Sequence, residues 1–182
     1  MKKLLISGLV FLFFFCAQKD QTEAKDVVDL VPTDNEISGW TRSSAMIVAE
    51  GETQLYALIN GAGQVYIDNG FVKSAFQNYV GEVSGNPTGE LKLQISDQGD
   101  TTNAKNVYDE VSEGTEIPWT EQDHAGMEAR YELMTTGFGY YVLEFWDDRF
   151  YTYIEINDGT QAGLGVVKLF ALNIFAAIRD TE

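Results

Sequence analysis

The stretch YYVLEFWDDRFYTYIEI, Tyr140 to Ile156, decides the fold. It holds two runs rich in aromatic and β-branched residues around Asp147-Asp148, the pattern of a β-hairpin. If those two aspartates form the turn, Phe145 faces Phe150 on one side of the sheet. The other side then carries a mixed set of side chains: Tyr140, Val142, Glu144, Trp146, Arg149, Tyr151, Tyr153 and Glu155. Because neither side is fully polar, the hairpin predicts an α+β fold, with an antiparallel sheet covered by helices on both faces.

Further elements are predicted around this hairpin from hydrophobic periodicity and turn residues. The apolar spacing from Leu55 to Tyr66 predicts a helix that Asn69-Gly70 ends. Asp100 is placed to cap a second helix, which runs to Ser112. The remaining expected elements are a hairpin of 71–83 and 90–96 around Gly85–Gly89, a strand at about 128–135, and an apolar helix at about 161–179.

The N-terminus has the features of an export signal. Lys2 and Lys3 precede an apolar run that ends at Phe15, shorter than the ~20 residues needed to span a bilayer. Cys16 follows, and the pattern resembles a bacterial lipoprotein signal, in which that cysteine is acylated. We predict a signal peptide at 1–15, a flexible tether at 16–29 and a globular domain at 30–182. The alternative is an ordinary secreted protein, since Phe15 stands where lipoproteins carry a small residue.

Charge and cysteine content narrow the functional classes. The formal net charge is -16, with 12 basic against 28 acidic residues. Such a chain repels phosphate backbones and anionic lipids, so we expect no nucleic-acid partner and membrane contact only through the N-terminal lipid. Cys16 is the only cysteine, so we expect no disulfide within the folded part.

The segment Asn60-Gly61-Ala62-Gly63 resembles a phosphate-binding loop at first sight. A dinucleotide loop would need glycine at Tyr66, and a P-loop would need Gly-Lys-Ser/Thr, which is absent. The periodicity places the glycines within a helix, where each costs ~1 kcal/mol relative to alanine. Close packing of a neighbouring backbone against Gly61 would offset that cost. The alternative is a ligand in the gap, contacted by Asn60 and Tyr56.

Several sequence blocks carry a resemblance to a known family: Gly39-Trp40, LYALINGAGQVYIDNGF, LKLQISDQGDTTNAKNVYDEV and RFYTYIEI. In this order they are similar to an uncharacterised family of bacterial secreted and lipid-anchored proteins, with Gly-Trp, Ile-Asn-Gly-Ala and Tyr-x-x-Gly-Phe blocks. The resemblance covers most of residues 37–156. It implies a PsbP-like α-β-α sandwich and assigns no activity.

Chemical motifs are sparse. His124 is the single histidine, which leaves neither a zinc set nor a triad, so we predict no catalytic residue, metal or cofactor. Asp97 and Asp100 lack the ligand spacing of a calcium loop. Tryptophans and strand tyrosines are expected mainly in the core, with a sugar- or peptide-stacking groove as the alternative.

The helix at 161–179 is the predicted place for a partner. Leu169 and Leu172 fall outside the arc assigned to the sheet, so they are candidate contacts for an envelope protein or a second copy of the chain. We therefore predict a non-catalytic binding or assembly module, exported and lipid-anchored to the cell envelope. The alternative is an extracytoplasmic hydrolase that uses carboxylates, which convergent carboxylates with raised pKa in a cleft would favour.

Overall fold

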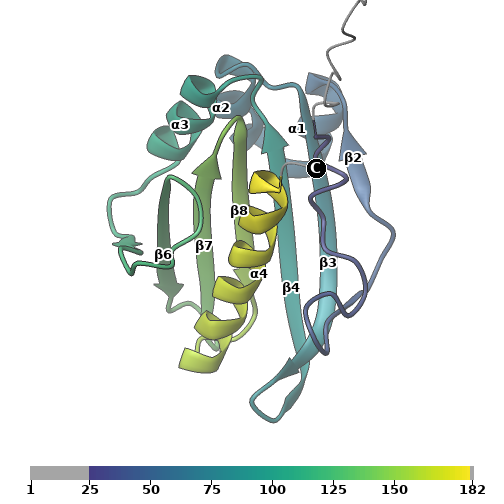
Figure 1. The fold of residues 1–182 in the computed structure, drawn as a ribbon, viewed down its shortest axis with the longest axis vertical. Helices are drawn as coiled ribbons and strands as arrows, with labels where there is room; N and C mark the ends of the chain where they lie inside the picture. Colours follow the sequence, from purple (N-terminus) through teal and green to yellow (C-terminus); the bar gives the residue numbers. More distant parts are fainter. Residues whose placement is uncertain (1–24, 181–182) are drawn as a thin grey trace, which may run out of the picture.

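The computed structural model describes residues 25–180, folded around one antiparallel sheet (Figure 1). This confirms the predicted α+β class with its antiparallel sheet. The predicted signal peptide, Cys16 and tether residues 16–24 lie outside the described residues.

The sheet has the order β1-β3-β4-β8-β7-β6-β5, with β2 also paired to β3. The strands are β1 Thr41–Arg42, β2 Ile47–Ala49, β3 Lys73–Val83, β4 Asn86–Asp97, β5 Ile117–Pro118, β6 Glu128–Met134, β7 Tyr140–Asp147 and β8 Phe150–Ile156. Strands β4 and β8, distant in sequence, lie side by side in the centre (Figure 1). Their pairing joins the two hairpins into one sheet.

The β7–β8 hairpin turns at Asp148 and Arg149, not at Asp147 and Asp148. Asp148 has a φ of 51°, a left-handed conformation that aspartate tolerates better than most residues. Asp147 pairs with Phe150, and Phe145 therefore faces Thr152 instead of Phe150. Because the register differs from the predicted one by two residues, each side chain stays on its predicted side of the sheet.

The β3–β4 hairpin also turns earlier than predicted. Ser84 and Gly85 have φ values of 44° and 90°, the two positive angles of a type I′ turn. The residues from Asn86 to Gly89, assigned to the turn from sequence, are the start of β4. The Asn-Pro pair and the second glycine misled the prediction, although proline can begin a strand.

The helices are α1 Glu52–Ile59, α2 Gly63–Asp68, α3 Thr101–Glu110 and α4 Gln161–Arg179. Asp100 caps α3 as predicted, because its carboxylate accepts the backbone N–H of Asn103 at 2.8 Å. Helix α3 ends two residues before the predicted end at Ser112. Helix α4 has the predicted range, and Thr160 caps it by accepting the N–H of Gly163.

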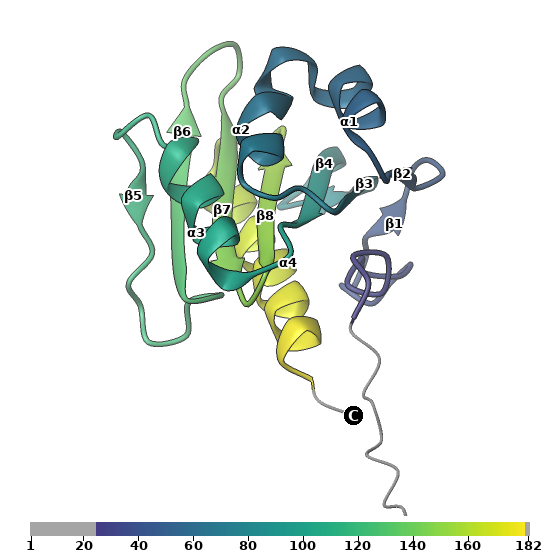
Figure 2. The ribbon, with the colours of Figure 1, turned by 90° about the horizontal axis from the view of Figure 1, so that it is seen from above.

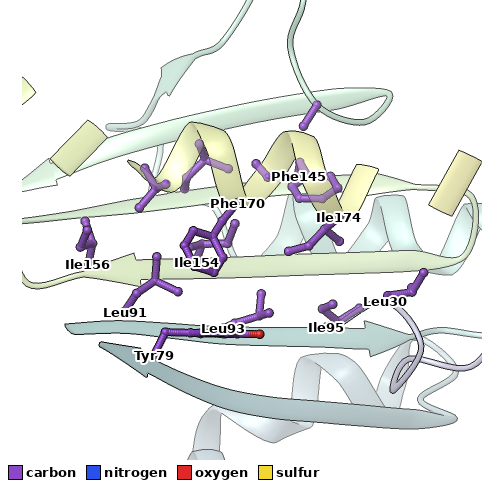
Figure 3. Packing of buried hydrophobic residues seen from close by; sticks show 14 of the residues in the cluster. Leu30, Tyr79, Leu91, Leu93, Ile95, Phe145, Ile154, Ile156, Phe170 and Ile174 are labelled. Carbon is purple, nitrogen blue, oxygen red and sulfur yellow. The ribbon is translucent and has the colours of Figure 1, made fainter. Parts of the chain in front are cut away.

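Alternate residues of β7 and β8 belong to two separate hydrophobic clusters. The larger, apolar cluster combines Leu143, Phe145 and Ile154 with Phe170 and Ile174 of α4 (Figure 3). The smaller cluster combines Trp146 and Tyr151 with residues of α1, α2 and α3: Leu55, Tyr66, Ala104, Val107 and Tyr108. Figure 2 draws strands β4 and β8 between α4 and the α1–α2 pair. The period of two along each strand therefore separates two packing environments.

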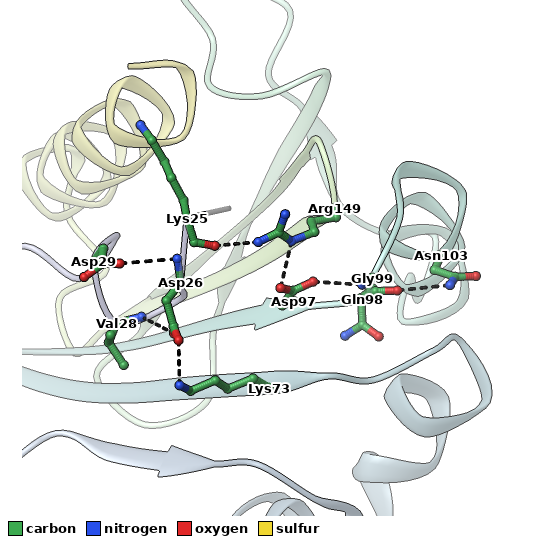
Figure 4. Close-up of polar contacts among 10 residues, drawn as sticks. All are labelled: Lys25, Asp26, Val28, Asp29, Lys73, Asp97, Gln98, Gly99, Asn103 and Arg149. Carbon is green, nitrogen blue, oxygen red and sulfur yellow. Dashed lines mark hydrogen bonds and ion pairs between the residues drawn. The ribbon is translucent and has the colours of Figure 1, made fainter. Parts of the chain in front are cut away.

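The N-terminal segment joins the fold before the predicted boundary at residue 30. Val27 is 1 % exposed and belongs to the apolar cluster. The Lys25 ammonium donates to the carbonyls of Ala177 and Asp180 at the C-terminal end of α4, where a cation is favoured. Arg149 donates to the Lys25 carbonyl and to Asp97 (Figure 4). Residues 25–29 therefore belong to the folded part instead of the tether.

Candidate functional site

Two hollows open beside α3, where that helix meets β5 and β6. The first has a volume of about 590 Å³. Its walls come from α3, from the segment around β5, from the following loop and from β6: Tyr108, Asp109, Glu116, Trp119, His124, Glu128 and Arg130. The second, of about 220 Å³, lies over the sheet and is lined by Glu113, Glu132, Tyr140, Val142, Glu144 and Tyr153. Glu116 and Arg130 line both hollows and form the boundary between them.

Arg130 is the centre of this site. It lies opposite Glu144 of β7 and Pro118 of β5, and only 6 % of it is exposed. Its guanidinium lies 4.1 Å from the centroid of the Tyr108 ring, a cation–π contact. Its Nε donates to Glu144 at 2.7 Å, and Nε lies 4.0 Å from Glu116. The β6–β7 register therefore pairs a buried cation with Glu144, and the loop before β5 brings Glu116 to its other side.

Both oxygens of Glu144 are engaged. Oε2 accepts from Arg130, and Oε1 accepts the hydroxyl of Tyr151 at 2.6 Å. Burial raises the pKa of Glu144 above its ordinary value, although the bond from Tyr151 and the charge of Arg130 oppose that rise. Burial also raises the pKa of Tyr151 well above its usual value, so this phenol stays protonated and donates.

The contact of Arg130 with Glu144 is geometrically incomplete. The Nη2 atom of Arg130 lies 2.7 Å from Glu144 Oε2, an ion-pair distance, but forms no directed hydrogen bond with any described residue. The cause is geometric, because Nε already donates to that oxygen and Tyr151 occupies the other one. A bidentate pair, the usual arrangement of arginine and carboxylate, is therefore incomplete here.

Glu116 orders the loop between α3 and β5. Its carboxylate accepts the N–H groups of Glu113 and Gly114 at 2.8 and 3.0 Å, and the Ser112 hydroxyl at 2.9 Å. Burial would raise the pKa of Glu116, but these hydrogen bonds and the charge of Arg130 outweigh it and leave the pKa below its usual value. Glu116 is therefore a fixed negative charge at the boundary of the two hollows.

The rim of the first hollow is acidic. Asp109 and Glu128 share one cation, Lys105, at 2.7 and 3.7 Å. At the second hollow, Glu113 and Glu132 take part in no ion pair with any residue from 25 to 180. Negative charge therefore exceeds positive charge around both openings, which favours ligands that carry ammonium or other cationic groups.

Tyr56 and Asn60, the predicted ligand contacts, lie away from both hollows. Tyr56 belongs to α1, and its hydroxyl donates to Gln64 of α2. Asn60 is exposed, has a φ of 53° and begins the short 3-10 turn Asn60–Ala62 that links α1 to α2. The predicted continuous helix is therefore broken at the Asn-Gly pair, because asparagine tolerates the left-handed conformation.

The packing hypothesis for Gly61 is wrong. A Cβ built at Gly61 would meet no atom within 4 Å, so no neighbouring backbone fills this position. A Cβ at Gly63 would lie 3.2 Å from the ring of Tyr56, which makes Gly63 the packed glycine of the pair. The segment follows helix α1, whereas a dinucleotide-binding loop would follow a strand.

Leu169 and Leu172 lie on the outer part of α4, but they differ in burial. Leu169 is 57 % exposed, whereas Leu172 is half-buried and packs against the apolar cluster. The arc of α4 that the periodicity assigns to the sheet is buried as expected, apart from the partly buried Phe175: Leu164, Val167, Phe170, Ala171, Ile174 and Ile178. Within residues 25–180, α4 is the one helix long and apolar enough to cross a membrane, a test that the core helix of a water-soluble protein also passes.

Arg130, Glu116 and Glu144 were not singled out from the sequence. One signal was available, because Glu144 is a carboxylate on a strand side that also carries Trp146, Tyr151 and Tyr153. A charge among aromatic neighbours indicates a buried partner. That partner, Arg130, lies on the separately predicted strand at 128–135, and the pairing of the two strands was not predictable from spacing. Trp40, Trp119 and Trp146 are buried as expected.

Comparison with known proteins gives no relative for this chain: no family model, curated protein or solved structure matches it. Among residues 25–180, no group of three or more histidine, cysteine, aspartate or glutamate side chains is placed to hold a metal ion.

Proposed function

We propose that this chain is an exported, lipid-anchored module of the cell envelope that binds a ligand or partner without transforming it. The carrying observation is the first hollow, an open space of about 590 Å³ lined by the buried Arg130 and by Glu116, whose carboxylate is held in place by backbone hydrogen bonds. Its volume lies in the range of small-molecule sites, and a few fixed polar groups in such a space give orientation and specificity.

The alternative, hydrolysis by carboxylates, has one observation in its favour. Glu144 has a raised pKa and Glu116 a lowered one, and separated pKa values are what an acid–base pair needs. Against it, Glu144 is only 8 % exposed and both of its oxygens already accept hydrogen bonds. A general acid must reach its substrate directly or through one water, so the binding function is favoured.

The membrane attachment is proposed from Cys16. Lys25 lies nine positions after Cys16, and an extended chain spans at most ~3.5 Å per residue, so the folded part would stay within ~30 Å of the bilayer. Replacing Cys16 by serine should move the protein to the soluble envelope fraction. A wild-type protein that is already soluble, with an N-terminus other than residue 16, would refute this attachment.

The architecture and the α4 contact remain part of the proposal. We infer a PsbP-like α-β-α sandwich and membership of the uncharacterised lipoprotein family, supported by the antiparallel sheet and the two packing clusters. Leu169 and Leu172 are proposed as a secondary partner contact, supported by the exposure of Leu169.

Site-specific photo-cross-linking in the living cell tests the binding function. A photoreactive residue at His124 samples the first hollow, one at Leu169 samples α4, and one at the exposed Val72 is the control. We expect an adduct from position 124 and none from position 72. Adducts from position 169 alone would move the binding surface to α4, and adducts from none of the positions would refute the module.

A further inference from the structure

The pair formed by α1 and α2, residues 52–69, covers part of one side of the sheet with few buried residues (Figure 2). Leu55 is the buried residue of α1, and Gly63 and Tyr66 are those of α2. The other apolar side chains of the pair pack on the smaller cluster while partly exposed: Leu58, Ile59, Val65 and Ile67. Helix α4, in contrast, buries residues along its whole length. Less apolar burial therefore holds the α1–α2 pair on the sheet than holds α4.

The side-chain hydrogen bonds of the pair join its own members. Gln64 of α2 accepts the hydroxyl of Tyr56 of α1 and donates to Asp68 at 2.7 Å. Asn69 donates to the carbonyl of Val65 at 2.9 Å. Neither helix has a side-chain N-cap, whereas Asp100 and Thr160 cap α3 and α4. These bonds stabilise the pair internally and do not attach it to the sheet.

Tyr66 connects the pair to the sheet. Its ring lies 5.7 Å from the ring of Tyr151 in a T-shaped arrangement, and its hydroxyl interacts with Tyr151 and Gln94. Tyr151 also donates to Glu144 at 2.6 Å. The attachment of the pair therefore meets the same polar network that pairs Glu144 with Arg130.

The strands below the pair carry hydroxyl and amide groups. Ser74, Gln94 and Ser96 are buried, and the register places them on the same side of the sheet as Tyr151. The hydroxyls of Ser74 and Ser96 are hydrogen-bonded to each other, and Gln94 donates to Ser96 at 3.0 Å. Water can replace the partners of such groups, so uncovering this surface costs less free energy than uncovering the apolar side under α4.

Glycines lie at both ends of the pair. Gly51 precedes α1 in an extended conformation, and Gly70 follows α2 with a φ of 76°. Hinge motions are absorbed by a few such residues at the ends of elements. The helices have 8 and 6 residues, too short to be stable in water without the sheet. Detachment of the pair therefore also breaks its helical hydrogen bonds.

We propose that residues 52–69 are a lid, which detaches from the sheet between Gly51 and Gly70 while α3, α4 and the strands stay folded. Opening uncovers the buried serines and the Tyr151 hydroxyl. The lid thereby controls whether solvent reaches the network of Tyr151 and Glu144 from the α1–α2 side. This inference goes beyond the proposed binding function and does not depend on it.

Thiol labelling at two buried positions tests the lid. Ser96→Cys places a thiol below the lid, and Thr152→Cys places one on the neighbouring central strand. Both positions are 0 % exposed, but Thr152 lies beside Phe145 on the α4 side and is the matched control. Each probe is placed in the full chain with Cys16→Ser, so that it is the only thiol.

Without denaturant, the thiol at position 96 should react at least about 100-fold faster than the thiol at position 152, because lid opening requires less than global unfolding. Its rate should also depend less on urea, since lid opening exposes less surface. Equal rates at the two positions, or the same urea dependence, would overturn the inference.

The Tyr66→Phe variant tests the connection through Tyr66. It removes the hydroxyl contact with the sheet and should speed labelling at position 96 about threefold to tenfold. Tyr79→Phe is the matched control, because the Tyr79 hydroxyl donates to the Pro32 carbonyl on the α4 side, a bond that survives lid opening. An equal acceleration in both variants would show that position 96 reacts through global unfolding.

If Ser96→Cys fails to fold, hydrogen exchange of the wild-type chain decides. The amides of α1 and α2 should exchange at least about 100-fold faster than those in the centre of α4, with one shared and weak urea dependence. Amides of α1 and α2 that exchange as slowly as those of α4, or that each follow a different urea dependence, would contradict opening as one unit.

Discussion

The two sides of the sheet are built from the same strands but differ in the side chains that those strands contribute. On the α4 side, β7 and β8 contribute Leu143, Phe145 and Ile154, which pack against Phe170. On the α3 side, the same strands contribute Glu144, Trp146, Tyr151 and Tyr153, which surround Arg130 or lie close to it. The first side is an apolar core. The second combines apolar packing with a buried ion pair and two hollows.

This difference indicates which side of the sheet mainly stabilises the fold and which side is the candidate for function. Apolar burial on the α4 side stabilises the fold directly. A buried ion pair is weak evidence for stability, because replacing it with apolar residues is often neutral or stabilising. The apolar side is therefore expected to supply most of the stability, and the polar side is the candidate for binding.

The largest loss of stability is expected on the apolar side, from Phe170→Ala. Phe170 is fully buried, with ring centroids 5.0 Å from Tyr79 and 5.6 Å from Trp40. Removing it leaves a cavity and should lower the free energy of unfolding by about 3–5 kcal/mol. Urea denaturation measures this, with Ala176→Gly on the exposed side of α4 as a mild control. A loss below about 1 kcal/mol would show that the cluster is not the core.

A loss of about 3 kcal/mol is expected on the polar side from Arg130→Met. The variant leaves Glu144 buried without its cation, which is costly in a low-dielectric site. The loss should shrink as the pH falls and Glu144 becomes protonated. Thermal denaturation across pH measures both effects. A loss that does not depend on pH would show that Glu144 is not the stranded charge.

The pH dependence of Glu144 itself is a smaller effect. Its pKa in the folded state is raised above the ordinary value of 4.5, so folding favours its protonated form. That contribution to stability is complete below the unfolded-state pKa and is lost as the pH rises through the folded-state pKa. Stability of the wild type relative to Glu144→Gln should therefore decrease from about pH 4 upward. A relative stability that rises over this range would contradict the raised pKa.

The smallest effects are expected at the outer edge of the apolar side. Leu172→Gln should cost about 1–2 kcal/mol, because this side chain packs on the cluster, whereas Leu169→Gln should stay within about 0.5 kcal/mol. Melting temperatures of the two variants provide the comparison. Equal decreases in melting temperature would mean that the boundary of the core on α4 does not lie between Leu169 and Leu172.

Sequence periodicity predicted most of the helices and strands, because such patterns involve residues that are close in sequence. The spacing in α4, the Asp100 cap and the sides of β7 and β8 depend on residues close in sequence. Turn positions were less predictable, since Asp148 and Ser84 adopt left-handed conformations that several neighbouring residues could also have taken. The break at Asn60 was missed for the same reason.

The hollow was not predictable because it depends on contacts between distant segments. Arg130 and Glu144 are 14 positions apart and meet only through the β6–β7 register. Glu116 reaches them through a loop whose shape depends on its own bonds to the Glu113 and Gly114 backbone. Composition showed an acidic chain, but not that its most buried arginine would lie beside these carboxylates.

The most direct test of the account replaces the polar network as a unit, with Arg130→Met, Glu144→Leu and Tyr151→Phe combined. If the network serves binding, the triple variant should unfold at a free energy equal to or above that of the wild type, because no buried charge or hydroxyl of the set is left unpaired. It should also lose the cross-linked adduct from position 124. A triple variant that is destabilised by more than about 2 kcal/mol, or that still gives the wild-type adduct from position 124, would contradict the account.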